Sequence, residues 1–227
     1  SLPEEEVRQA GLAGLLHDLG KAAIPLEVLN KPGKLTDEEF DVVRTHPVAG
    51  YEMLKEGAQV SAPVLDACLH HHEKMDGTGY PDRLAGEKIS LIARMAAVCD
   101  VYDAVTSDRP YKRGWDSSES LRRMTEWTGG HFDTRVFQAF VKTIGIYPVG
   151  SLVRLASGRL GVVTEQGRKS LVTPRVKVFF SIRSHLRITP EEIDLAAPSC
   201  SDRIAAREDP AQWNFPDLHS MWTGVSG

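Results

Sequence analysis

HDLGKAAIP, residues 17–25, and HHEKMDGTGYP, residues 71–81, are the two stretches that decide the fold of this chain. Each places histidine after an apolar stretch of helical character and before a glycine-containing loop. The sequence has eight histidines, and five of them lie between positions 17 and 72. Imidazole and carboxylate groups gathered at helix ends in this way predict a metal site more strongly than any single histidine does.

The segments that carry these motifs are predicted to be helices. Residues 3–19 have a leucine stripe at helical spacing, and the first motif lies at the end of this helix. Residues 36–57 open with a Thr-x-x-Glu capping box, and Pro47 is expected to kink or divide this helix beside His46. Further helices are expected over residues 62–75, 90–107, 117–129 and 133–145.

The pattern changes after residue 148. Residues 151–166 alternate apolar and polar side chains around a Ser-Gly turn, which predicts a β-hairpin, and residues 175–188 continue with strand-forming residues. The tail is expected to be irregular and held down by its aromatic residues Trp213, Phe215 and Trp222. The sequence therefore predicts a mainly α fold: a helical bundle at 1–148, a small C-terminal β appendage at 149–195 and an irregular tail at 196–227.

Composition narrows the classes of function. The net charge is −4 and the pI is about 6.1, so no overall basic field favours long nucleic acid. The sequence has no run of about 18 apolar residues and no signal-peptide pattern, so no membrane span is expected in this segment. Cys68, Cys99 and Cys200 are far apart, which argues against disulfides and favours the reducing cytoplasm. The chain begins with Ser and is expected to be part of a longer protein.

The donor atoms indicate which kind of metal site to expect. Asp100 lies in the apolar stretch AAVCDVYDAV, where a carboxylate needs a partner such as a metal ion. Asp18 has two oxygens and is therefore the natural ligand to bridge two ions. Imidazole and carboxylate without thiolate suit Mn, Fe, Ni or Zn, and argue against a structural zinc site. Two ions about 3.5–4 Å apart activate a water and steady a leaving oxygen, which is the chemistry of phosphoester hydrolysis.

Three motifs carry a resemblance to a known family. HDLGK resembles the signature of the HD superfamily of metal-dependent phosphohydrolases. Together with HHEKMDGTGYP and AAVCDVYDAVTSDRPYK, residues 96–112, it is similar to the HD-GYP family over residues 4–148. Enzymes of that family hydrolyse the bacterial second messenger cyclic di-GMP. The resemblance implies an HD-type helical bundle and hydrolysis of cyclic di-GMP to linear pGpG, with GMP as a further product to consider.

The resemblance also implies roles for individual residues. Six positions match its metal ligands: His17, Asp18, His46, His71, His72 and Asp100. These would hold two or three divalent ions, with iron or manganese favoured over nickel or zinc. His17, Asp18 and Lys21 are the expected catalytic residues. Substrate contacts are expected from Lys21, Tyr80, Asp103, Arg109 and Lys112.

The neighbours of these residues are assigned lesser roles. Gly77 and Gly79 are expected to supply positive φ angles in the tight loop before Tyr80. Glu73 is expected to orient a ligand histidine, and His70 is interpreted as an ordinary residue. Family members usually have a further helix, with additional ligands, before the position where this sequence begins. The number of ions is therefore left open.

Two other classes of function stay open at this stage. One is a different HD phosphohydrolase acting on a dNTP or on (p)ppGpp, although the GYP loop and TSDRPYK argue against it. The other is a catalytically weak cyclic di-GMP receptor, or an adaptor that docks a diguanylate cyclase domain. A homodimer is also considered.

Overall fold

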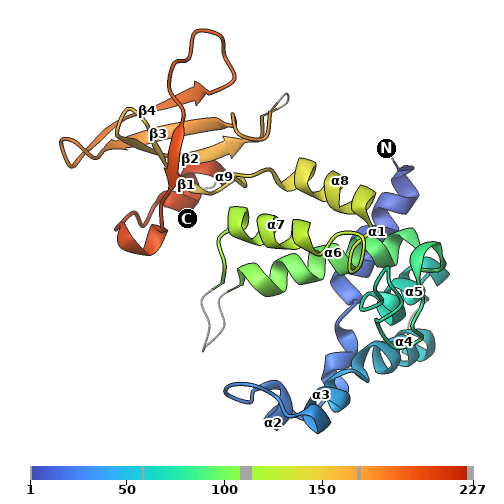
Figure 1. Ribbon diagram of the computed structural model, residues 1–227. Coiled ribbons are helices and arrows are strands. Elements are labelled where there is room, and N and C mark those ends of the chain that lie inside the picture. The colour runs from blue at the N-terminus through green and yellow to red at the C-terminus, as the bar shows by residue number, and fades with distance from the viewer. Residues whose placement is uncertain (1, 58, 108–113, 168–169, 224–227) are drawn as a thin grey trace. The chain divides into compact units, whose positions relative to one another are not determined.

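The computed structural model describes residues 2–57, 59–107, 114–167 and 170–223. The chain forms two compact units, residues 1–140 and 141–227 (Figure 1). The first unit is helical and the second is built on a β-sheet, so the predicted fold class is confirmed. Within the described part of the chain, every helix is too short or too polar to cross a bilayer.

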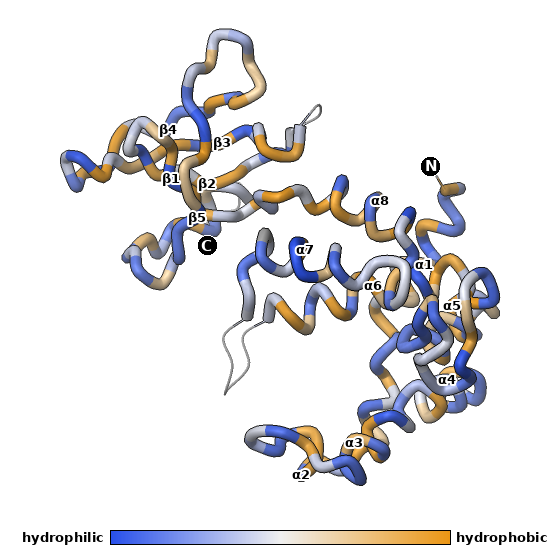
Figure 2. The backbone as a smooth tube through the Cα atoms, viewed as in Figure 1, coloured by the Kyte–Doolittle hydropathy of each residue, from blue (hydrophilic) through white to orange (hydrophobic). Residues whose placement is uncertain are grey.

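The helices follow the predicted order. Their bounds are α1 (Glu4–Leu16), the 3-10 turn η1 (Leu19–Ala23), α2 (Leu26–Leu29), α3 (Asp37–Val43), α4 (His46–Gly57), α5 (Ala62–His70), the 3-10 turn η2 (Gly86–Lys88), α6 (Leu91–Thr106), α7 (Ser117–Glu126) and α8 (Thr134–Ile144). The tube in Figure 2 shows hydrophobic segments in α6 and α8 and mainly hydrophilic ones in α7. The sequence missed α2, which is only one turn long.

The division between α3 and α4 follows from local sequence. The Thr36 side chain accepts from the Glu39 backbone N–H, and the Glu39 side chain accepts in return, which forms the predicted capping box. The chain breaks at residues 44–45, and α4 begins at His46 with Pro47 in its first turn. Proline is tolerated there because an N–H at that position has no partner within the helix. The predicted break beside His46 is confirmed.

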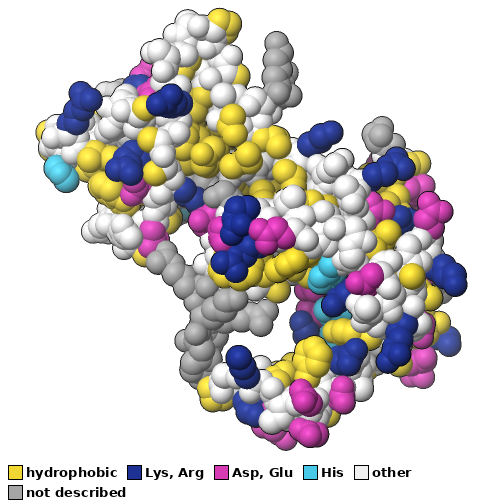
Figure 3. All heavy atoms as spheres, in the orientation of Figure 1, with side chains coloured by type: hydrophobic (Ala, Val, Ile, Leu, Met, Phe, Trp, Pro, Cys, Tyr) yellow, Lys and Arg dark blue, Asp and Glu magenta, His cyan; other side chains and the backbone are white. Residues whose placement is uncertain are grey.

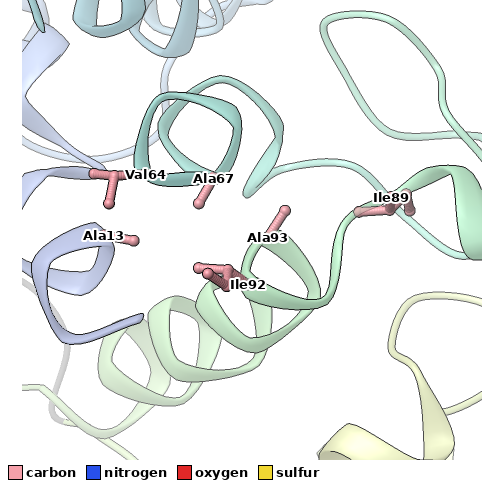
Figure 4. Packing of buried hydrophobic residues seen from close by; sticks show 6 residues of the cluster. All are labelled: Ala13, Val64, Ala67, Ile89, Ile92 and Ala93. Carbon is pink, nitrogen blue, oxygen red and sulfur yellow. The ribbon is translucent and has the colours of Figure 1, made fainter. Parts of the chain in front are cut away.

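The core of the helical unit joins α1, α5 and α6 (Figure 4). The buried residues of this cluster are Ala13, Val64, Ala67, Ile89, Ile92 and Ala93. Three of the six are alanines, and such small side chains allow neighbouring helices to approach closely. The core therefore fixes the helix ends that carry the two motifs.

The second unit is an antiparallel sheet in the order β4-β3-β2-β1-β5. Its strands are β1 (Leu152–Leu155), β2 (Arg159–Glu165), β3 (Arg175–Ser181), β4 (Leu186–Asp194) and β5 (Ile204–Arg207). β1 and β2 form the predicted hairpin, with Gly158 at a φ of 81° in the turn. Both faces of the strands β1 to β3 carry buried residues, one face around Val153 and Val176 and the other around Leu152 and Phe179.

The tail is more regular than the sequence predicts. Within 196–227, residues Ile204–Arg207 form β5, which pairs with β1, and Leu218–Thr223 form α9. The expectation of an irregular tail is wrong for these two segments, because pairing with the open edge of β1 creates a strand that local sequence does not signal. The expected anchoring is confirmed, since Trp213, Phe215 and Trp222 pack on the buried cluster of the sheet.

Candidate metal centre

Four helices of the first unit deliver the candidate ligands to one place. We call these residues the histidine–aspartate cluster: His17, Asp18, His46, His71, His72 and Asp100. The first pair follows the end of α1, His46 begins α4, the adjacent histidines follow α5, and Asp100 lies within α6. Ligand atoms approach within 4.8 Å of one another in two groups, His46–His71–His72 and His17–Asp18–His71.

Three histidines of the cluster are oriented in the same way. The Nδ1 atoms of His17, His46 and His71 lie 2.7–2.8 Å from the carbonyl oxygens of Gly14, Val43 and Cys68, each three residues earlier. A carbonyl only accepts, so each Nδ1 carries the proton. In the neutral imidazole, Nε2 then presents a lone pair, which is the arrangement of a metal-ligating histidine.

Asp18 stands at the centre of these lone pairs. Its Oδ1 atom is buried, finds no hydrogen-bond donor in the described residues, and lies 3.3 Å from Nε2 of His46 and 4.0 Å from Nε2 of His71. A hydrogen bond from His46 would need a proton on Nε2, but the neutral ring already uses its only proton at Nδ1. A carboxylate oxygen facing two nitrogen lone pairs is repelled by both unless a cation lies between them. The residues present therefore fit a bound metal ion.

Asp100 completes the other side of the cluster. Its carboxylate lies 3.6 Å from Nε2 of His17 and 3.8 Å from Nδ1 of His72. The side chain is only 18% exposed, which agrees with the expectation that this carboxylate needs a partner. Ala97 and Val98, which precede it on α6, are buried, whereas the Asp100 carboxylate faces the cluster.

Charge separates the histidines into two kinds. Hydrogen bonds to Asp100 and Asp18 raise the pKa of His17 to about 10. Burial, reinforced by the neighbouring imidazoles, lowers the pKa of His71 to about 4 and that of His72 to about 3. Burial opposes ionisation of Asp18, but hydrogen bonds from His17 and Lys21 outweigh it and lower the pKa of this carboxyl. At neutral pH the imidazoles of His71 and His72 are therefore uncharged, and each can offer a nitrogen lone pair to a metal ion.

Gly20 allows the first motif to reach α4. A Cβ atom at this position would lie 1.9 Å from the carbonyl oxygen of His46 and 2.4 Å from the backbone nitrogen of Gly50. Any side chain would therefore separate η1 from α4. The glycine of HDLGK is needed for this close approach, which brings Asp18 to His46.

Lys21 lies on the same turn as Asp18. Its Nζ atom is 2.5 Å from Oδ2 of Asp18, and the Lys21 side chain is 42% exposed. The ammonium therefore borders both the cluster and solvent, where it can meet an anionic substrate.

Tyr80 stacks on the cluster from the second motif. The centroid of its ring is 4.8 Å from that of His72, at an interplanar angle of 26°. The guanidinium carbon of Arg44 lies over the Tyr80 ring, 4.7 Å from its centroid. Burial raises the pKa of Tyr80, so the phenol keeps its proton. Arg44 was missed from the sequence, where its only signal is a position two residues before His46.

The two glycines before Tyr80 are needed for different reasons. Gly77 has a φ of 78°, as predicted. Gly79 does not have positive φ, so that expectation is wrong. A Cβ at Gly79 would lie 2.5 Å from Cα of Glu73, which means that the backbones pass too close for a side chain.

The expectations for Glu73 and His70 also need correction. Glu73 is buried, but its Oε1 accepts from the backbone N–H of Asp82 rather than from a ligand histidine. His70 is not ordinary: its ring nitrogens lie 2.8 Å from Asp66 and 3.0 Å from Asp82. A buried histidine between two acids was not recognisable from sequence, because both partners are brought to it by folding.

Three further residues were expected to contact the substrate, and the structure describes one of them, Asp103. Asp103 is exposed on α6 and its carboxylate accepts a hydrogen bond from Ser107. Arg109 and Lys112 lie outside the described residues. On the face shown in Figure 3, acidic and basic side chains are interspersed over the helical unit rather than segregated.

A helical bundle that presents histidine and aspartate at the ends of several helices defines the chain as an HD-type metal-binding protein. The model of the HD domain family matches residues 1–136, and the chain belongs to this family. The resemblance drawn from the motifs is thereby confirmed.

Three curated relatives are named as cyclic dinucleotide phosphodiesterases. A cyclic di-GMP phosphodiesterase of Pseudomonas aeruginosa is 63% identical over 225 residues, which cover 99% of this chain and 54% of that protein. A cyclic di-GMP phosphodiesterase response regulator of Xanthomonas campestris is 49% identical over 144 residues, 62% of this chain and 38% of that protein. A 3'3'-cGAMP-specific phosphodiesterase of Vibrio cholerae is 35% identical over 142 residues, 62% of this chain and 27% of that protein. The chain thus spans about half or less of the length of these relatives.

Proposed function

We propose that this chain catalyses metal-dependent hydrolysis of a phosphodiester bond of cyclic di-GMP to give linear pGpG. The observation that carries the proposal is the buried Oδ1 of Asp18, which has no donor in the described residues and faces the Nε2 atoms of His46 and His71. Relatives named as cyclic dinucleotide phosphodiesterases support the choice of substrate class.

Two divalent ions fit the donor set. One would take His46, His71 and His72 with Asp18, and the other His17 and Asp100 with Asp18 as the shared ligand. Bound there, the ions supply Lewis-acid chemistry that activates a water and offsets charge on the phosphodiester. We favour iron or manganese, because nitrogen and oxygen donors without thiolate suit both. Nickel and zinc bind such sites more tightly than iron or manganese, so an ion found after purification need not be the active one.

The residues around the cluster have complementary tasks. Lys21 keeps its ammonium beside Asp18 and contacts a phosphate oxygen of the substrate. Tyr80, stacked on His72, offers a ring and a protonated hydroxyl to a nucleotide. Arg109, Lys112 and Asp103 are assigned to substrate binding on the strength of the family motif. In this assignment residues 1–148 are the catalytic region, 149–195 the appendage and 196–227 the tail, and the protein works in the cytoplasm.

Turnover with metal analysis on one preparation tests the proposal. Purified protein, reconstituted separately with Fe, Mn, Ni and Zn, is given cyclic di-GMP, 3'3'-cGAMP, a dNTP and ppGpp. We expect hydrolysis of cyclic di-GMP to pGpG, fastest with Fe or Mn. Preference for dNTP or ppGpp would contradict the substrate, and highest activity with zinc alone would contradict the metal. Tight binding of cyclic di-GMP without turnover in any metal form would indicate a receptor or adaptor instead. The same preparation, examined by sedimentation, tests whether the chain forms the homodimer considered above.

A further inference from the structure

The loop that carries Tyr80 is closed on itself. We call residues 76–85 the GYP loop. An isolated β-bridge joins Asp76 and Ala85 at its two ends. Thr78 donates through its backbone and its hydroxyl to Asp76, so the first turn is also bound internally. These contacts hold the loop together but do not attach it to the helix end that bears His71 and His72.

Among the contacts that make that attachment, three surround Tyr80. The Tyr80 N–H donates to the carbonyl of His72 at 3.3 Å, and the Asp82 N–H donates to Oε1 of Glu73 at 2.7 Å. The Asp82 carboxylate lies 3.0 Å from Nε2 of His70. One residue, Asp82, therefore fastens the loop to the segment after α5 through both its backbone and its side chain.

His70 is itself held in place. Its Nδ1 atom lies 2.8 Å from Oδ1 of Asp66, one turn earlier on α5. With Nδ1 fixed to Asp66, the ring has one orientation available, and its Nε2 faces Asp82. Asp66, His70 and Asp82 therefore form a chain of side-chain contacts that runs from α5 to the GYP loop.

We propose that His70 is a positioning residue: by bridging Asp66 and Asp82 it holds the GYP loop so that Tyr80 stays stacked on His72. The consequence for catalysis rests on the proposed function, in which Tyr80 contacts the nucleotide. His70 then affects substrate binding through the loop, whereas metal binding by the histidine–aspartate cluster does not depend on His70.

The substitutions that test this role differ in their risk to folding. His70→Ala removes the bridge from a buried position, whereas Asp82→Ala removes the same bridge at a side chain that is 56% exposed and keeps the backbone N–H for Glu73. Thr78→Val is the matched control, because it removes a hydrogen bond within the loop and leaves the bridge intact.

Hydrogen exchange of the full chain gives a readout that needs no substrate. We expect the amides of Tyr80 and Asp82 to exchange about tenfold faster in His70→Ala and in Asp82→Ala, and the double variant to match the single ones because both remove one interaction. Exchange that is unchanged in Asp82→Ala, or effects that add in the double variant, would overturn the proposal.

Kinetics then separate positioning from general structural damage. In both variants we expect KM for cyclic di-GMP to rise about tenfold with metal content unchanged. Hydrolysis of bis(p-nitrophenyl) phosphate, which has no base to place on Tyr80, is expected to stay within twofold of the wild type. Loss of metal, or an equal rise in KM in Thr78→Val, would overturn the role of His70. If the wild type does not hydrolyse cyclic di-GMP, the proposed function fails, while the exchange experiment still decides whether His70 holds the loop.

Discussion

The Nε2 atoms of His46 and His71 lie 3.3 Å apart, although 25 positions separate these residues in the sequence. Neither atom has a proton to share in the neutral rings, because both rings donate through Nδ1 to a carbonyl. Both side chains are almost fully buried, so water does not screen their mutual repulsion. The pair is therefore built for a cation, and the predictions below follow from its surroundings.

Asp18 is expected to decide how many ions bind. Asp18→Asn keeps the size of the side chain but leaves one acceptor oxygen, so it cannot bridge two ions through a carboxylate. We expect metal content, measured by mass spectrometry, to fall by about one ion per chain and hydrolysis to be lost. Full metal occupancy with near-normal turnover would contradict the bridging role.

Metal binding is expected to release a proton at one side of the cluster. His17, with a pKa of about 10, is protonated at pH 8 and must lose that proton to ligate. Affinity at this side should therefore fall about tenfold for each pH unit below about 10. His71 and His72 are already neutral at pH 8, because their pKa values are about 4 and 3, and should bind without proton release.

Calorimetry at pH 8 in two buffers of different ionisation enthalpy measures this release. The expected result is about one proton for one class of ion and none for the other. Binding enthalpies that do not depend on the buffer would show that His17 is not a ligand.

Lys21 is expected to serve turnover rather than metal binding. Lys21→Met keeps the length of the side chain and removes the ammonium beside Asp18. We expect kcat/KM to fall roughly ten- to a hundredfold, the effect of losing one charged hydrogen bond, with metal content equal or higher. Lys31→Met is the control, because Lys31 pairs with Glu39 of the capping box and should leave kinetics unchanged. A drop in bound metal in Lys21→Met would contradict this assignment.

Arg44 is expected to support the Tyr80 ring. Its guanidinium stacks on Tyr80 at 4.7 Å, so Arg44→Ala should raise KM several-fold, as expected for a contact of about 0.5–1 kcal/mol. Arg123, on α7, makes a similar contact, with its guanidinium carbon 4.4 Å from the centroid of the Trp115 ring, so Arg123→Ala serves as the matched control. Equal effects of the two substitutions on KM would rule out a specific role for Arg44.

The α1 helix offers a test of how packing supports the site. Ala13 is fully buried between α5 and α6, whereas Leu15 is 82% exposed on the same helix. We expect Ala13→Leu to lower the free energy of unfolding by about 1–3 kcal/mol through overpacking and to weaken metal binding, because α1 delivers His17. Leu15→Ala should change neither quantity. Chemical denaturation of the full chain measures the free energy of unfolding, and metal titration of the same protein measures metal binding.

Much of the local structure could be predicted because its causes lie close together in the sequence. The Thr36–Glu39 capping box, the Ser90 cap of α6 and the break at Pro47 each depend on residues within a few positions. The tail was predicted less well, since β5 forms only by pairing with β1, about 50 residues earlier in the chain. A strand of this kind has no signal until its partner is in place.

The sequence by itself determined the helical class, the starts of the capped helices and the residue types of the candidate site, because hydrophobic periodicity, caps and donor chemistry are local properties. Only the tertiary structure decided which atoms meet. It brought the Nε2 atoms of His46 and His71 to Asp18, placed the Tyr80 ring against both Arg44 and His72, and joined His70 to Asp66 and Asp82. These contacts depend on how α1, α4 and α5 pack, which the spacing of residues along one chain does not specify.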